Sequence, residues 1–177
     1  MGTMARRIFI ALPISKQLEE HVAAFRAQHR DLPVRWLTGK NLHITVIPPW
    51  EEEQVEPITD LLETIQRTTG PISLNFHLVT YGPNKEPRLI WAEGEAPDQI
   101  FTLKHNIERT LSRAPELRPF RLHMTLARFA PEEFSTFPVQ DLKDSVSWSD
   151  EASSFTLMES HRLPQGADYE ILSSFQL

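Results

Sequence analysis

The sequence predicts one domain of mixed strands and helices, built from two halves with the same order of elements. Its length of 177 residues fits a single domain, or two small lobes that share a core. Hydrophobic residues make up 40% of the chain and charged residues 24%, as in ordinary globular proteins. A strand, a helix and a second strand are predicted over residues 8–46, and the same order recurs over residues 89–126. Side-chain identity between the halves is slight, so the order alone is weak support for a duplication.

Each predicted element follows from hydrophobic spacing and from the positions of proline and glycine. Short apolar runs indicate strands, and apolar residues at every third or fourth position indicate helices. Ser15 is a suitable N-cap for the first helix, and Pro48-Pro49 is expected to end the second strand because proline donates no ladder hydrogen bond. The acidic run Glu51–Glu53 is interpreted as a structural helix start. The expected elements are, in order, a strand at 8–12, a helix from Ser15 to about residue 29, a strand at 42–47, a helix at 52–68, strands at 72–79 and 88–91 around a loop at 81–87, a helix at 98–112, a strand at 121–127, an irregular segment at 130–150, and strands at 154–159 and 169–175.

Two of the predicted strands carry the same five-residue pattern. The first reads Leu-His-Ile-Thr-Val from residue 42, and the second reads Leu-His-Met-Thr-Leu from residue 122. Successive side chains of a strand point to opposite faces. His43 and Thr45 therefore share one face of their strand, and His123 and Thr125 share one face of theirs. The apolar residues of each pattern occupy the face behind.

A structural role would explain either pattern on its own. Threonine is favoured in strands, and a histidine on a sheet face is usually hydrogen-bonded and structural. That explanation weakens when both patterns stand at matching positions of two similar halves. Independent draws would produce such a pair by chance at a rate of about one in a thousand or less. We therefore interpret His43 and His123 as candidate catalytic residues.

Two histidines that face one cleft suit the chemistry of phosphodiesters. Histidine titrates near neutrality, so one ring can act as a base while the other, protonated, acts as an acid. Threonine hydroxyls can donate hydrogen bonds to the non-bridging phosphate oxygens. Arg128 follows the second pattern and can bind a phosphate through two hydrogen bonds, or can be a solvated cation at a strand end. This chemistry requires no metal ion and no cofactor.

Composition and missing motifs exclude several other classes. The chain has no cysteine, which rules out disulfides, thiolate nucleophiles and cysteine-based zinc sites. It has no P-loop, no H-E-x-x-H, no G-x-S-x-G and no dinucleotide fingerprint. The net charge of −6 argues against a protein that coats nucleic acid, though not against a pocket for one phosphate. No targeting or membrane segment is visible, so a cytoplasmic location is expected. Met4 is a suitable natural start, and the Met-Gly-Thr before it is expected to be a remnant of cloning.

The two H-x-T-x motifs, about 80 residues apart, resemble the signature of the two-histidine phosphoesterases. Within that superfamily the chain is most similar to the LigT-like RNA 2′,3′-cyclic phosphodiesterases, also named 2′-5′ RNA ligases. The second motif matches closely and includes Arg128. The similarity extends over nearly the whole chain, through the opening strand, the approach to the first motif, a central strand and the closing hairpin, namely Arg7–Leu12, Trp36–His43, Leu89–Trp91 and Ser160–Leu172.

The resemblance implies a bilobal α+β fold, in which antiparallel strands of two pseudo-symmetric lobes line a central cleft with helices outside. It implies a single domain over residues 1–177. The implied reaction is hydrolysis of a 2′,3′-cyclic phosphate, at an RNA 3′ end or in a small cyclic nucleotide, to a 2′-phosphate. By this analogy His43 is the general acid and His123 the base that activates water, while Thr45, Thr125 and Arg128 hold the phosphate. The sequence alone does not decide which histidine takes which role.

One departure from the family follows the first motif. The chain reads Ile47-Pro48-Pro49-Trp50 where the family usually continues with an aromatic, apolar strand end and a glycine, and we expect the prolines to reshape the cleft rim. Trp36 and Trp50 can each stack on a base, or pack in the core or rim. Two other functions remain open, a module that binds a phosphorylated ligand without turnover and an ATP-independent RNA ligase. We expect a monomer that contacts no membrane.

Overall fold

The computed structural model describes residues 4–164 and 166–177, so the three residues expected to be a cloning remnant lie outside it. Its strands are β1 (Arg6–Pro13), β2 (Arg35–Trp36), β3 (His43–Glu52), β4 (Ile72–Gly82), β5 (Leu89–Gly94), β6 (Leu122–Arg128), β7 (Lys143–Ala152), β8 (Ser154–Leu163) and β9 (Gly166–Gln176). Its α-helices are α1 (Lys16–Gln28), α2 (Val55–Glu63) and α3 (Asp98–Thr110), and its 3₁₀ turns are η1 (Gly39–Asn41) and η2 (Pro131–Thr136). Within the described residues, no helix is both long and apolar enough to cross a membrane.

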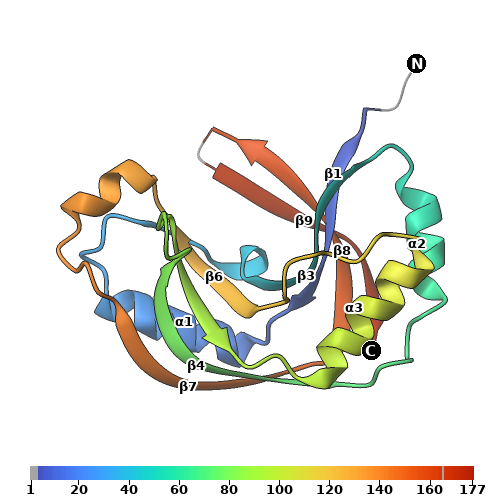
Figure 1. Cartoon of the computed structure of the whole chain (residues 1–177), viewed down its shortest axis with the longest axis horizontal. Coiled ribbons are helices and arrows are strands. Elements are labelled where there is room, and N and C mark those ends of the chain that lie inside the picture. Colours follow the sequence, from blue (N-terminus) through green and yellow to red (C-terminus); the bar gives the residue numbers. More distant parts are fainter. Residues whose placement is uncertain (1–3, 165) are drawn as a thin grey trace.

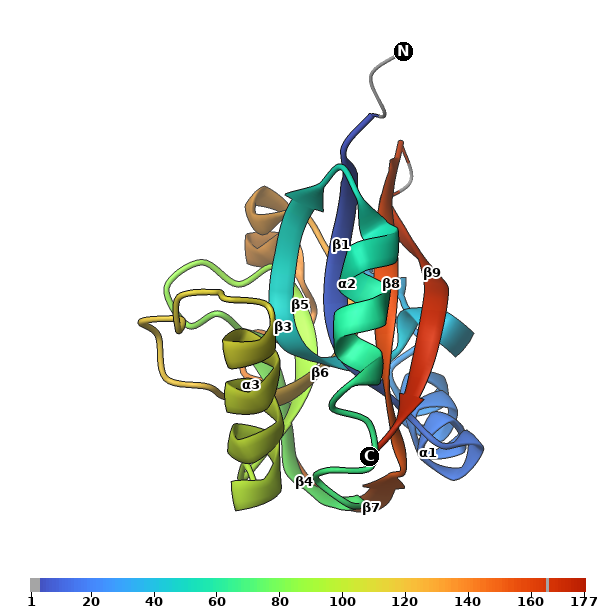
Figure 2. The same ribbon diagram turned by 90° about the vertical axis from the view of Figure 1, so that its right-hand side faces the viewer.

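The strands form two antiparallel sheets that lie side by side (Figure 1). One sheet has the order β3-β1-β8-β9, and the other has the order β2-β6-β5-β4-β7. Helix α1 packs on β7, where the Phe25 ring meets the Trp148 ring edge-on, with 5.9 Å between centroids. Helices α2 and α3 pack against each other, and α2 covers the outer face of the four-stranded sheet (Figure 2). The predicted α+β class is therefore confirmed.

The repeated order of elements has a structural counterpart. In the first half β1 is followed by α1 and later by its antiparallel neighbour β3, and in the second half β5 is followed by α3 and its antiparallel neighbour β6. Each half thus contributes one motif strand, β3 to the four-stranded sheet and β6 to the five-stranded sheet. These two strands contact each other across the boundary between the sheets.

The prediction that Pro48-Pro49 ends a strand is wrong, because β3 runs on to Glu52. Strand β3 is an edge strand that pairs only with β1, so its prolines need not donate to a second neighbour. The register moves from Ile10↔Ile47 to Ile8↔Trp50, which places one extra residue of β3 in a bulge at the prolines. Because the strand continues, Glu51 and Glu52 belong to β3 and do not open a helix, and α2 begins only at Val55.

The segment 130–150, predicted to be irregular, contains the turn η2 and most of strand β7. Strand β7 pairs with β4 along its length and forms the edge of the five-stranded sheet. Its residues are mostly polar because every second side chain lies on a face exposed to solvent, and only Trp148 and Ala152 are buried. The apolar spacing on which the prediction relied is therefore weak in this strand.

Candidate active site

All five predicted site residues line one cleft of about 1020 Å³ between the two sheets. His43 and Thr45 reach it from β3, and His123, Thr125 and Arg128 reach it from β6. Successive side chains of a strand point to opposite faces, which explains this placement. The apolar residues at positions 42, 44 and 46 and at positions 122, 124 and 126 are buried behind each strand, while the histidines and threonines are only partly buried and face the cleft. The structure thus brings together residues about 80 positions apart in sequence.

The two imidazole rings are held in the same way. Nδ1 of His43 lies 3.2 Å from the carbonyl oxygen of Asn41, and Nδ1 of His123 lies 3.0 Å from that of Arg121. A carbonyl only accepts hydrogen bonds, so in both rings Nδ1 carries the proton and donates it. When the ring is neutral, Nε2 is then the atom with the free lone pair. The repeated geometry leaves Nε2 of each histidine as the atom that can exchange a proton with a bound phosphate ester.

The surroundings of the two histidines differ. The His43 ring packs against the rings of Phe9 and Tyr169, with centroids 5.0 Å and 4.9 Å away. Burial of the ring is the main cause that lowers its pKa, the Asn41 hydrogen bond acts in the opposite direction, and the nearby Arg128 and His123 lower it as well. Together these effects bring the pKa of His43 to about 4. His43 is therefore neutral at pH 7 in the unliganded cleft. His123 packs on the Trp91 ring at 5.0 Å.

Arg128 is not the solvated strand-end cation that the sequence left open. It is partly buried and lines the cleft, and its Nη2 donates to the Tyr169 hydroxyl at 3.3 Å. Its Nε is buried and finds no hydrogen-bond partner among the described residues. A buried donor without an acceptor costs free energy, and an anion in the cleft would supply that acceptor.

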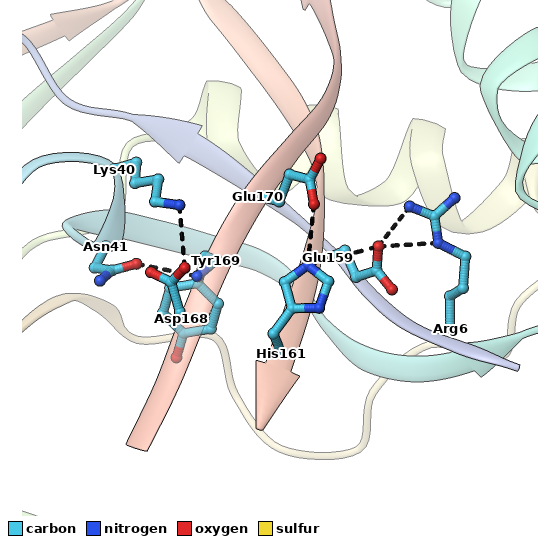
Figure 3. Close-up of polar contacts among 8 residues, drawn as sticks. All are labelled: Arg6, Lys40, Asn41, Glu159, His161, Asp168, Tyr169 and Glu170. Atoms are coloured by element: carbon cyan, nitrogen blue, oxygen red, sulfur yellow. Dashed lines mark hydrogen bonds and ion pairs between the residues drawn. The ribbon is translucent and has the colours of Figure 1, made fainter. Parts of the chain in front are cut away.

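Sequence reasoning missed the supporting role of Tyr169 and Asn41. Tyr169 contacts the His43 ring and the Arg128 guanidinium, and its backbone amide donates to Oδ1 of Asn41 at 3.1 Å (Figure 3). Beside this bond, Nζ of Lys40 pairs with Asp168 at 3.1 Å. The family resemblance pointed to Tyr169 only as part of the closing hairpin. Its position beside His43 depends on pairing between strands that lie far apart in the chain.

Neither tryptophan proposed for base stacking lines the cleft. Trp36 packs edge-on against Phe25, with 6.2 Å between centroids. The Trp50 ring lies under the guanidinium of Arg113 at 4.3 Å, and its Nε1 donates to Glu52 at 3.3 Å. Both rings therefore have packing roles. Pro49, at the bulge in β3, does line the cleft.

Charge in the cleft has the opposite sign to the charge of the chain. The net charge of the chain is −6. The charged residues that line the cleft are one glutamate, Glu133, and four arginines, Arg7, Arg35, Arg128 and Arg162. This local excess of positive charge favours an anionic ligand.

One group of side chains among the described residues has the spacing to hold a metal ion. Ligand atoms of Glu159, His161 and Glu170 lie within 4.8 Å of one another. These residues do not line the cleft, and Glu159 is already paired with Arg6 while His161 is hydrogen-bonded to Glu170 at 3.0 Å (Figure 3). The cluster therefore has a sufficient explanation as an ion-pair network on the outer part of the β8–β9 hairpin.

Comparison with solved structures defines the fold of this chain. A crystal structure of a Thermus thermophilus protein is similar with a TM-score of 0.77 and 22% sequence identity, covering 97% of both chains. The crystal structure of Escherichia coli LigT complexed with 3′-AMP is similar with a TM-score of 0.74 and 22% identity, covering 98% of both chains. The fold is thus that of LigT-like proteins, as the resemblance implied.

Sequence comparison then defines the family. Residues 14–163 match the family model of the 2′-5′ RNA ligase superfamily, and the chain belongs to that superfamily. An RNA 2′,3′-cyclic phosphodiesterase of Bacillus subtilis (strain 168) is 29% identical over 149 residues, which cover 81% of this chain and 80% of that relative. A protein of the same name from Methanocaldococcus jannaschii is 25% identical over 177 residues, which cover 96% and 99%. The prediction of an enzyme of the two-histidine phosphoesterase class is confirmed at this level.

Proposed function

We propose that this protein hydrolyses the 2′,3′-cyclic phosphate at an RNA 3′ end to a 2′-phosphate, without a metal ion, in the cytoplasm. The observation that carries the proposal is the pair of imidazoles in one arginine-lined cleft, each oriented by the same Nδ1 hydrogen bond. The names of the two curated relatives support the choice of substrate.

In the proposed reaction, one histidine removes a proton from water as the water oxygen attacks phosphorus. The bond between phosphorus and the 3′ oxygen then breaks, and the second histidine donates a proton to that departing oxygen. The products are a 2′-phosphomonoester and a free 3′ hydroxyl. Thr45, Thr125 and Arg128 donate hydrogen bonds to the non-bridging oxygens, where negative charge increases in the transition state.

The resemblance makes His43 the acid and His123 the base, and the surroundings of His43 bear on that assignment. A ring whose pKa is lowered to about 4 is neutral before substrate binds, as a base must be. An acid at this position would have to gain its proton when the anionic phosphate binds beside it and raises its pKa. The packing of His43 therefore makes the opposite assignment, with His43 as base, a specific second candidate.

The activity is tested with 2′,3′-cyclic nucleotides and short cyclic-ended RNA in the presence of EDTA, with identification of the product isomer. We expect wild-type protein to form the 2′-phosphate, and we expect His43→Ala and His123→Ala each to lose at least about 100-fold in kcat. Binding without turnover would support a binding module instead. Turnover that persists in both variants would overturn the site assignment.

The roles of the two histidines are separated by the leaving group. A p-nitrophenyl phosphodiester releases a weakly basic phenolate, which departs without a proton from the enzyme. The variant that lacks the acid should therefore recover most of its activity on this substrate, whereas the variant that lacks the base should not. Recovery by His43→Ala supports the assignment implied by the family, and recovery by His123→Ala supports the reverse.

A further inference from the structure

We propose that Arg35 forms, beside Arg128, a subsite for a second phosphate, so that the preferred substrate is a cyclic-ended oligonucleotide and not a free cyclic mononucleotide. The inference rests on the proposed function, because it assumes that Arg128 holds the reacting phosphate. Arg35 would then bind the phosphodiester on the 5′ side of the terminal nucleotide.

The register of the five-stranded sheet places these two arginines directly opposite each other. Arg35 of β2 pairs with Arg128 of β6, and both line the cleft. Like charges at opposite positions of an antiparallel pair destabilise a sheet. In the part of the chain that the structure describes, no carboxylate forms an ion pair with either guanidinium. Arg35 and Arg128 therefore place two uncompensated positive charges next to each other, and this arrangement suits a ligand with more than one negative group.

The four-stranded sheet leaves room for the Arg35 guanidinium. Gly166 begins β9 with φ of +115°, a conformation that favours glycine, and a Cβ at this position would lie 2.4 Å from Cζ of Arg35. The guanidinium thus lies directly against the backbone of Gly166. Arg128 reaches the same strand through the Tyr169 hydroxyl. Arg35 and Arg128, both from the five-stranded sheet, thus lie against β9 of the four-stranded sheet, at the same end of the cleft.

The size of the cleft agrees with a ligand larger than one nucleotide. Small-molecule sites measure about 300–1,000 Å³, so this cleft of about 1020 Å³ lies at the upper end of that range and has room for more than a mononucleotide. Arg7 and Arg162 also line it, from β1 and β8. A short RNA end, which carries more than one phosphate, matches a cleft lined by several arginines better than a ligand with one phosphate does.

The test compares two substrates that differ by one internal phosphodiester, adenosine 2′,3′-cyclic phosphate and the ApA dinucleotide with a 2′,3′-cyclic end. We expect wild-type kcat/KM to be about 10-fold higher for the dinucleotide, the effect of one hydrogen-bonded charge pair. Arg35→Gln should remove that advantage by raising KM for the dinucleotide more than KM for the mononucleotide. Arg118→Gln removes the same charge at an exposed position outside the cleft, and it should keep the advantage.

The other possible results distinguish a second-phosphate subsite from a role of Arg35 at the reacting phosphate. An equal loss on both substrates in Arg35→Gln would mean that Arg35 serves the reacting phosphate, which overturns the subsite. Equal wild-type kcat/KM on both substrates would overturn it as well. If wild-type protein hydrolyses neither substrate, the proposed function fails, and the subsite is then tested by titration with the two 2′-phosphate products. Weaker binding of only the dinucleotide product by Arg35→Gln would uphold the subsite, and unchanged binding would overturn it.

Discussion

The packing of the His43 ring affects both its protonation and the stability of the fold. The ring packs against two aromatic rings that also contact each other, and its Nδ1 is fixed on a backbone carbonyl. This packing holds the ring in place, as the proposed proton transfer requires, and also makes the charged form unfavourable. An unfolded chain has no such packing, so the ring takes up a proton more readily when the protein is unfolded.

We expect stability to fall as the pH is lowered from 7 to 4. The folded pKa of His43 is about 4 and its ordinary value is 6.5, so between these values the unfolded state binds more protons and the free energy of unfolding increases with pH. The contribution is about 1–3 kcal/mol, because solvent still reaches part of the ring. Urea unfolding at pH 7 and pH 4.5 measures it. His43→Gln should depend less on pH than wild type by that amount, and an identical dependence would contradict the packing argument.

Most elements could be predicted from the sequence because they bury a continuous apolar face. The strand ending at Pro13 and the helix capped by Ser15 are of this kind, and Oγ of Ser15 indeed accepts from the Leu18 amide at 3.1 Å. Strand β7 lacked that signal because it is a polar edge. The five candidate site residues, which line one cleft, could be singled out because each motif is local in sequence. Asn41, Tyr169 and Arg35 were not assigned roles, because their positions depend on strand pairing between distant segments.

At the scale of elements, the η1 turn links the first motif to the closing hairpin. We expect Asn41→Ala to lower the free energy of unfolding by about 1–2 kcal/mol, because the amide of buried Tyr169 loses its acceptor. Turnover should also fall several-fold, since Tyr169 packs on His43. Lys40→Ala is the matched control on the same turn, because its ion pair with Asp168 is exposed and should leave the melting temperature unchanged. Similar effects of both changes would contradict a specific role for Asn41.

At the scale of the whole molecule, the chain passes repeatedly between the two sheets. It runs from β1 in the four-stranded sheet to β2 in the five-stranded sheet, returns for β3, crosses again for β4–β7, and returns for β8 and β9. Neither sheet is therefore made from one continuous segment. Buried residues of both sheets also belong to one hydrophobic cluster.

This connectivity predicts that residues 1–177 unfold as a single domain. Far-ultraviolet circular dichroism and tryptophan fluorescence should report the same urea midpoint, because the four tryptophans are distributed over both sheets. Calorimetry should likewise yield equal calorimetric and van't Hoff enthalpies. Two separated midpoints would mean that the lobes unfold independently, in spite of the four crossings.

We expect phosphate buffers to affect this protein directly, because the facing arginines of β2 and β6 suit an anion. An ion that relieves the repulsion between Arg35 and Arg128 binds the folded chain and not the unfolded one, so it stabilises the fold by mass action. If Arg128 and Arg35 hold the substrate as proposed, the same ion occupies the place of the substrate and competes with it. We therefore expect a higher phosphate concentration to raise the melting temperature and to lower the catalytic rate, so that values of either should be compared only at the same anion concentration.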